Sequence, residues 1–250
     1  MAPASLQYDP ILAPYNYIRS STIALIEHDN VRTTLTPFIP NARVLELACG
    51  SGFYTYDLLK WGASSVVGVD ISTVLMDKAR SVGEEMGVGK RVEFIQADSW
   101  LLNYASDREG LVQMFRNVAV NLKEGDRFVS ITVPPSENPI DSLNAEATAR
   151  PEPEESGHLM YKHIKDVEGG IFFGVHGETP VGKLYFECYH LRKEIYEEAA
   201  REAGLKGTLE WGVTDVPERF LREDAPGGAT LRELETYKST PAHGILVITK

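Results

Sequence analysis

The stretch VLELACGSGFYT, residues 44–55, decides the fold. It begins as a short apolar run, turns at Gly50-Ser51-Gly52, and continues into a segment with helical spacing that ends before Gly62. A strand that passes through a glycine turn into a helix is half of a βα unit, and a glycine after a helix is typical of its C-terminal cap. The turn glycines allow positive φ and a close ligand approach, and the helix N-terminus offers free N–H groups.

The same pattern repeats outward from this stretch. Residues 66–70 form a second apolar run, residues 72–86 an amphipathic helical segment, and residues 92–98 a third apolar run. Short apolar strands that alternate with amphipathic helices predict βαβ units on a parallel sheet with both faces covered. We therefore expect an α/β fold with a doubly wound, Rossmann-like, mostly parallel sheet.

The rest of the chain is less regular. We expect short helices before residue 41, a loop over 134–153 and a β-hairpin from residues 171–175 and 183–189. Further predicted elements are a helix over 111–122, a strand over 127–133, a helix over 192–203 and a final strand over 244–249. The organisation predicted from this pattern is an N-terminal cover segment, 1–40, and one domain, 41–250. A β-rich insertion at about 135–183 precedes the last helix.

Acidic residues end the three predicted parallel strands or lie close to their ends. Asp70 stands eighteen residues after Gly52, where a carboxylate can accept hydrogen bonds from both hydroxyls of a ribose, and Asp98 ends the third strand. Thr55 replaces the third glycine of the dinucleotide pattern, and the chain has no phosphate-binding GKS or GKT loop. Glu46 would repel a pyrophosphate. These features favour a ligand with an adenosine and a cationic centre.

Taken together, the three segments resemble the class I S-adenosylmethionine-dependent methyltransferases. Residues 44–55 look like the first motif of that family, residues 66–72 like the second, and residues 96–99 like the third. The family has glycine where this chain has Ala48. The resemblance extends to the N-terminal segment around Tyr15 and to the closing strand.

The resemblance implies S-adenosyl-L-methionine as the cofactor and a site for it. The implied cofactor-binding residues are Tyr15, Glu46, Ala48, Gly50, Gly52, Asp70, Ile71, Ala97, Asp98 and Ser99. Trp100 and Asn103 are similar to residues that line the methyl-transfer site in the family. No catalytic base is assigned: any of His158, His163, His176 and His190 could serve a hydroxyl acceptor, but such a histidine is more often a surface or core residue.

One segment of the family pattern is missing. The third motif is normally followed by a fourth strand, but this chain passes directly from Asp98-Ser99 to Trp100. A connection between parallel strands takes about a dozen residues or more. We therefore expect an internal deletion: either the sheet lacks its fourth strand, or residues 92–97 move into that place.

Composition bounds the class of protein. The 250 residues are 43% hydrophobic and 24% charged, which is typical of a globular chain, and the net charge of −11 disfavours nucleic acid or an anionic membrane as partner. Cys49 and Cys188 fit buried thiols in a reducing compartment, with no metal-ligand spacing. We expect a cytoplasmic protein without a metal, and its oligomeric state stays open.

The function expected from the resemblance is methyl transfer from S-adenosylmethionine to a small acidic or neutral molecule. Two alternatives stay open. A non-catalytic binder of the same cofactor, or a defective relative, would keep the three motifs and lose the transfer side. A nicotinamide-dependent oxidoreductase would need the glycine that Thr55 replaces.

Overall fold

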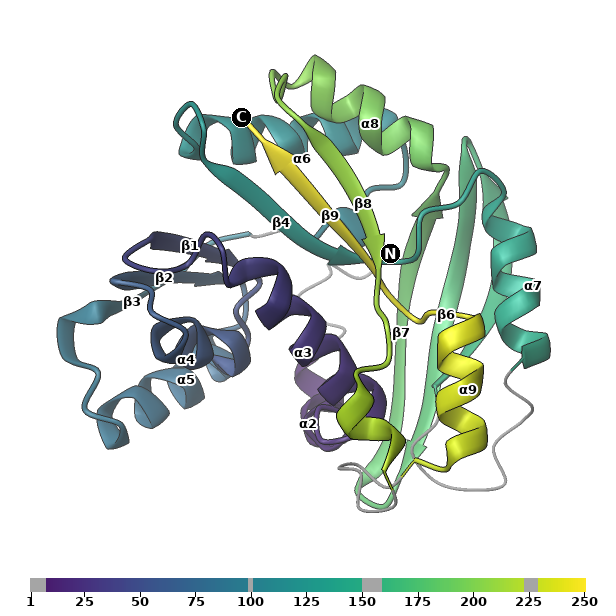
Figure 1. The fold of residues 1–250 in the computed structure, drawn as a ribbon, viewed down its shortest axis with the longest axis horizontal. Coiled ribbons are helices and arrows are strands. Elements are labelled where there is room, and N and C mark those ends of the chain that lie inside the picture. Colours follow the sequence, from purple (N-terminus) through teal and green to yellow (C-terminus); the bar gives the residue numbers. More distant parts are fainter. Residues whose placement is uncertain (1–7, 99–100, 150–158, 223–228) are drawn as a thin grey trace. The chain divides into compact units, whose positions relative to one another are not determined.

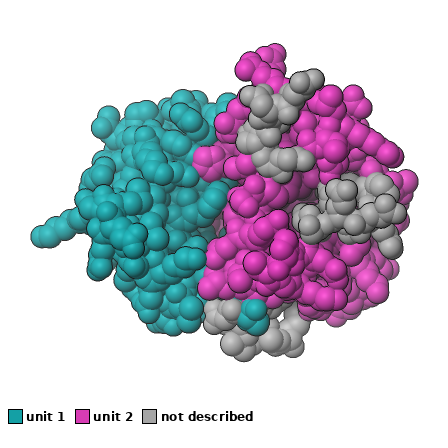
Figure 2. All heavy atoms as spheres, turned by 90° about the horizontal axis from the view of Figure 1, so that it is seen from below, with its two compact units in different colours: residues 1–10, 32–101 teal, residues 11–31, 102–250 magenta. Residues whose placement is uncertain are grey.

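The computed structural model describes residues 8–98, 101–149, 159–222 and 229–250. The chain divides into two compact units, shown in different colours in Figure 2. Unit 1 comprises residues 1–10 and 32–101, and unit 2 comprises residues 11–31 and 102–250. The structure does not determine how the two units are placed relative to each other, so each is described separately.

Unit 1 is built on a three-stranded parallel sheet with the strand order β1-β2-β3. In its register Val44 lies beside Val66, and Val66 beside Val92. Helices α4 and α5 connect the strands and lie on one face of the sheet (Figure 1). The bounds are β1 Arg43–Leu47, α4 Phe53–Lys60, β2 Ser65–Asp70, α5 Thr73–Glu85, the 3₁₀ turn η2 Gly89–Arg91 and β3 Val92–Gln96. The mixed α/β class with a parallel sheet is thus confirmed.

The core of unit 1 lies between the sheet and α4. Val66 of β2 is fully buried there, packed with Tyr56, Leu58 and Leu59 of α4. The helix ends at Lys60, and Gly62 follows with a φ of 111°. This agrees with the helix end that was predicted from Gly62 in the sequence. This packing fixes the start of α4, and with it the turn that leads out of β1.

The first sheet of unit 2 is antiparallel, with β9 between β4 and β8. Helices α6 and α8 lie beside this sheet (Figure 1), and ring contacts join Phe115 of α6 to Phe128 of β4 and Tyr196 of α8 to Trp211 of β8. The bounds are α6 Arg108–Asn121, β4 Arg127–Thr132, α8 Lys193–Glu202, β8 Leu209–Val213 and β9 Gly244–Thr249.

The second sheet of unit 2 is an antiparallel meander of β5, β6 and β7, contacted by α2 and α7. Helix α3 begins in unit 2 and its last residues belong to unit 1; its Ile26 packs with Phe220 of η4 and Leu234 of α9. The bounds are η1 Asp9–Ile11, α2 Leu12–Ile18, α3 Thr22–Leu35, η3 Leu102–Tyr104, α7 Pro139–Ala149, β5 Leu159–Val167, β6 Gly170–Thr179, β7 Gly182–Leu191, η4 Glu218–Leu221 and α9 Leu231–Ser239.

The structure corrects part of the predicted element list. The hairpin of β6 and β7 is confirmed, but the loop predicted over 134–153 is wrong, because Pro139–Ala149 form α7. Strands β5 and β8 and helix α9 were not predicted. A signal for α9 was present in the sequence, since Thr230 and Glu233 form a capping box at its start.

The described strands bear on where β3 lies in the sheet. Strand β3 stays paired with β2, so it does not move across the sheet. Between β3 and β4 the described residues contain η3 and α6 but no strand. Among the described strands β1 pairs only with β2 and forms the edge of its sheet. No described helix is long and apolar enough to cross a membrane.

Candidate functional site

The candidate site is the turn that follows β1. Ala48, Gly50 and Gly52 all have positive φ, at 55°, 54° and 84°. The backbone N–H of Cys49 donates to the Val69 carbonyl oxygen at 3.1 Å, which fastens the turn to β2. The segment between β1 and α4 therefore contains three residues in the left-handed region of backbone conformation.

The two glycines of the turn serve different purposes. A Cβ at Gly52 would lie 2.7 Å from the Tyr56 ring, so this glycine is required by packing. A Cβ at Gly50 would meet only the Leu75 side chain, at 4.0 Å. Gly50 thus leaves open space above the backbone, and it is the position where a ligand can approach the turn.

Asp70 joins the turn to the start of α5. Its carboxylate is almost fully buried, and its two oxygens accept the backbone N–H groups of Gly50 at 2.8 Å and of Ser72 at 2.9 Å. A carboxylate offers about four acceptor positions, so two are left for further donors. Asp70 both holds the turn in shape and keeps the capacity to bind a diol.

Glu46 lies in β1, below the turn. Its Oε2 accepts a hydrogen bond of 2.5 Å from the hydroxyl of Thr55, a fully buried residue of α4. Burial raises the pKa of Glu46 to about 7, the nearby Asp70 carboxylate adds to this, and the Thr55 hydrogen bond partly opposes it. A carboxyl group held half-protonated near neutral pH would be ionised by a neighbouring cation.

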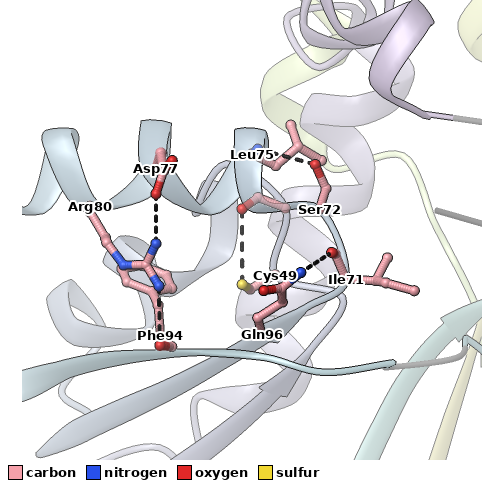
Figure 3. A network of polar contacts seen from close by, with 9 residues as sticks. Cys49, Ile71, Ser72, Leu75, Asp77, Arg80, Phe94 and Gln96 are labelled. Carbon is pink, nitrogen blue, oxygen red and sulfur yellow. Dashed lines mark hydrogen bonds and ion pairs between the residues drawn. The ribbon is translucent and has the colours of Figure 1, made fainter. Parts of the chain in front are cut away.

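The ends of β2 and β3 complete this side of unit 1 (Figure 3). Gln96 donates through Nε2 to the carbonyl oxygen of Ile71 at 3.3 Å, and the Ser72 hydroxyl caps α5 by accepting from the N–H of Leu75 at 3.2 Å. Ala97 and Asp98 are exposed. The predicted site residues Ser99 and Trp100 lie outside the described residues.

The remaining predicted residues belong to unit 2. Tyr15 of α2 lines a cavity together with Glu27 of α3. Asn103 accepts a hydrogen bond of 2.5 Å from the Thr132 hydroxyl at the end of β4. Unit 1 thus brings together Glu46, Gly50 and Asp70, whereas Tyr15 and Asn103 are held by contacts within the other unit.

The structure also adds two residues that the sequence did not assign to the site. The Thr55 hydroxyl donates to the Glu46 carboxylate, and the backbone N–H of Ser72 donates to the Asp70 carboxylate. Ser72 could have been found from the sequence, because a serine before an amphipathic segment is typical of a helix N-cap.

His190 is a core residue: it is buried, its Nε2 lies 3.1 Å from the Pro134 carbonyl oxygen, and burial lowers its pKa to about 4.

Comparison with known families identifies this part of the chain. The sequence model of the family described as "Methyltransferase domain" matches residues 44–129, which include the turn, Asp70 and β3. This match covers about a third of the chain and shows that residues 44–129 are similar to a methyltransferase domain. The match begins within β1 and ends within β4. No curated protein matches the sequence.

Solved structures agree with the methyltransferase fold. An S-adenosylmethionine-dependent methyltransferase from Mesorhizobium loti aligns with a TM-score of 0.56 and 18% identity over 88% of this chain and 96% of that chain. A protein from Listeria monocytogenes described as a S-adenosylmethionine-dependent methyltransferase gives 0.56 and 17%, over 91% and 97%. The [4+2]-cyclase SpnF gives 0.54 and 16%, over 98% and 95%. At these identities the likeness concerns the fold alone.

Proposed function

We propose that this protein is a methyltransferase that transfers a methyl group from S-adenosylmethionine to a small-molecule acceptor. The observation that carries the proposal is the turn after β1, where Gly50 leaves open space directly beside a buried aspartate. The family match over residues 44–129 supports the same cofactor.

The residues of unit 1 fit this cofactor. The two free acceptor positions of Asp70 suit the two hydroxyls of a ribose, and Glu46 suits the cationic amino-acid end. Ala48, Gly52, Ile71, Ala97, Asp98 and Ser99 complete the proposed cofactor-binding set of unit 1. Bound S-adenosylmethionine supplies a methyl group on a positively charged sulfur.

The protein contributes orientation rather than covalent chemistry. Asp70 keeps one geometry because both of its oxygens are tied to backbone N–H groups, so a diol meets a preformed acceptor. Glu46 releases its proton when a cation lies beside it, because the carboxylate then gains a charge partner. Cofactor affinity should therefore rise as the pH rises through about 7.

The proposal is tested by titrating the purified protein with S-adenosylhomocysteine in a calorimeter. We expect saturable binding that weakens about ten- to a hundredfold in Asp70→Asn, because a hydrogen bond to a charged group is worth about 1.5–3 kcal/mol. Asp77→Asn is the matched control, because Asp77 lies on the exposed side of α5 and pairs only with Arg80 among the contacts described. Absence of binding in the wild-type protein would overturn the proposal.

A second candidate function is cofactor binding without methyl transfer. It is favoured by β1, which forms a sheet edge, and by the absence of a strand from the described residues between β3 and β4. We infer that the segment supplying a fourth strand in the family is deleted here. The cyclase SpnF illustrates that a protein of this fold can carry another activity. Binding of S-adenosylhomocysteine with no transfer of a labelled methyl group to any acceptor would support this candidate.

A further inference from the structure

Unit 2 contains a partly open cavity of about 110 Å³, and all of its lining residues belong to unit 2. Its walls come from α2, α3, β5, β7 and the segment before β9. They are mostly apolar: Ile18, Ile23, Ala24, Leu159, Leu184 and Phe186. An enclosed apolar cavity of about 150 Å³ binds benzene, so this smaller, partly open one accommodates at most a single small ring, with part of the ring at the open side.

One wall of the cavity is charged. Glu27 of α3 is buried, with 6% of its surface exposed. Its Oε1 lies 3.1 Å from Nη1 of Arg19, and its Oε2 lies 3.5 Å from Nε2 of His243. All three residues line the cavity. A buried carboxylate needs such partners, because desolvation of an isolated charge costs several kcal/mol.

This triad sets the chemistry that the cavity can recognise. Glu27 offers acceptor positions, Arg19 offers N–H donors, and their charges cancel. A hydroxyl group can donate one hydrogen bond and accept another, so it can donate to Glu27 and accept from Arg19 at once. A carboxylate ligand would face the Glu27 charge, and a hydrocarbon would leave the polar wall without a new partner.

We propose that the cavity binds a small neutral aromatic compound with one hydroxyl group, of the size and chemistry of phenol. The ring packs against the apolar wall, with Tyr15 and Phe186 as aromatic neighbours, and the hydroxyl meets Glu27 and Arg19. This binding is independent of the proposed function of unit 1.

The test compares three probes, phenol, benzene and benzoate, by NMR titration of the full chain. We expect phenol to bind at least tenfold more tightly than benzene and benzoate, with amide shifts in α3 and β7. In Glu27→Gln the preference for phenol over benzene should fall toward one. Glu235→Gln, an exposed change on α9, is the matched control. Equal binding of benzene, or tighter binding of benzoate, would overturn the hydroxyl assignment.

A second variant keeps the test decisive if Glu27→Gln fails to fold. Ala24 lines the cavity and is 3% exposed, so Ala24→Leu fills the space while leaving the triad intact. We expect it to abolish phenol binding without lowering the melting temperature. Undiminished phenol binding by this variant would place the ligand elsewhere and overturn the inference.

The two proposals fail separately in the same experiment. S-adenosylhomocysteine is titrated into the wild-type and Ala24→Leu proteins beside phenol. Binding of S-adenosylhomocysteine without phenol overturns the cavity assignment alone. Binding of phenol without S-adenosylhomocysteine overturns the proposed function and leaves the cavity as a site of another activity.

Discussion

Strands β1 and β9 have similar apolar sequences but different surroundings. VLEL of β1 occupies the edge of the parallel sheet, and Leu45 is 41% exposed. ILVI of β9 lies between β4 and β8, and its Leu246 and Ile248 are fully buried. The difference shows that burial of an apolar strand depends on its neighbours on both sides, which composition alone does not reveal.

The two faces of β1 sharpen this contrast. Val44 packs in the cluster that contains Tyr56 and Leu58 of α4, and Glu46 is hydrogen-bonded to Thr55 of the same helix. Leu45 points to the opposite face, since side chains alternate along a strand. The face of β1 toward α4 is therefore covered, while its other face keeps an exposed leucine.

The largest expected effect compares the same substitution in the two strands. Leu246→Ala should lower the free energy of unfolding by about 3–5 kcal/mol, because it leaves a cavity among fully buried side chains. Leu45→Ala should cost less than about 1 kcal/mol, because much of that side chain is already in water. Urea denaturation of both variants measures the difference. Similar losses would show that Leu45 is buried in solution and would remove the contrast.

A second prediction compares one buried titratable group in each unit. The pKa values of the two groups are shifted in opposite directions. The pKa of Glu46 rises from 4.5 to about 7, so the folded state holds this proton more tightly than the unfolded state. Its contribution to stability is complete below pH 4.5 and is lost as the pH rises to 7. The pKa of His190 falls from 6.5 to about 4, so its contribution is complete above pH 6.5 and is lost as the pH falls to 4.

Each shift corresponds to about 3 kcal/mol at about 1.4 kcal/mol per pKa unit. Glu46→Gln should remove the loss of stability between pH 4.5 and 7 and leave the acid-side loss unchanged. His190→Gln should do the reverse. Urea midpoints of the three proteins from pH 4 to 8 provide the measurement. A wild-type pH dependence that survives both substitutions would contradict the assignments.

The smallest expected effect lies in the turn that leaves β1. Ala48 has a φ of 55°, a conformation that costs a residue with a Cβ about 1 kcal/mol or more. Ala48→Gly should therefore stabilise the protein by about 0.5–1 kcal/mol after the greater entropy of the unfolded chain is subtracted. Thermal unfolding is sensitive enough to detect it.

Gly50→Ala is the matched opposite change. A Cβ there meets only Leu75 at 4.0 Å, so its cost of about 1 kcal/mol comes from the backbone at φ 54°. If Ala48→Gly does not stabilise the protein and Gly50→Ala does not destabilise it, residues 48 and 50 do not keep their positive φ values in solution.

The sequence by itself determined the βα units of unit 1 and the turn. Strand–turn–helix spacing is local, so residues 44–55, the helix end at Gly62 and the place of Asp70 could be predicted from periodicity and glycine chemistry. The methyltransferase resemblance inferred from these motifs agrees with the family model that matches residues 44–129. Strand β8 was missed because it gains its order by pairing with β9, far later in the chain. Helix α7 and strand β5 were missed although α7 packs on β5 and β5 forms a hairpin with β6, the strand directly after it.

Only the tertiary structure decided which motif residues do what. It showed that Gly52 serves packing against Tyr56 while Gly50 leaves space, and that Asp70 spends two of its acceptor positions on the backbone. It also brought Arg19, Glu27 and His243 together around the unit 2 cavity, from positions up to 224 residues apart. Such contacts leave no local pattern, because burial and desolvation depend on which distant side chains the fold places around a group.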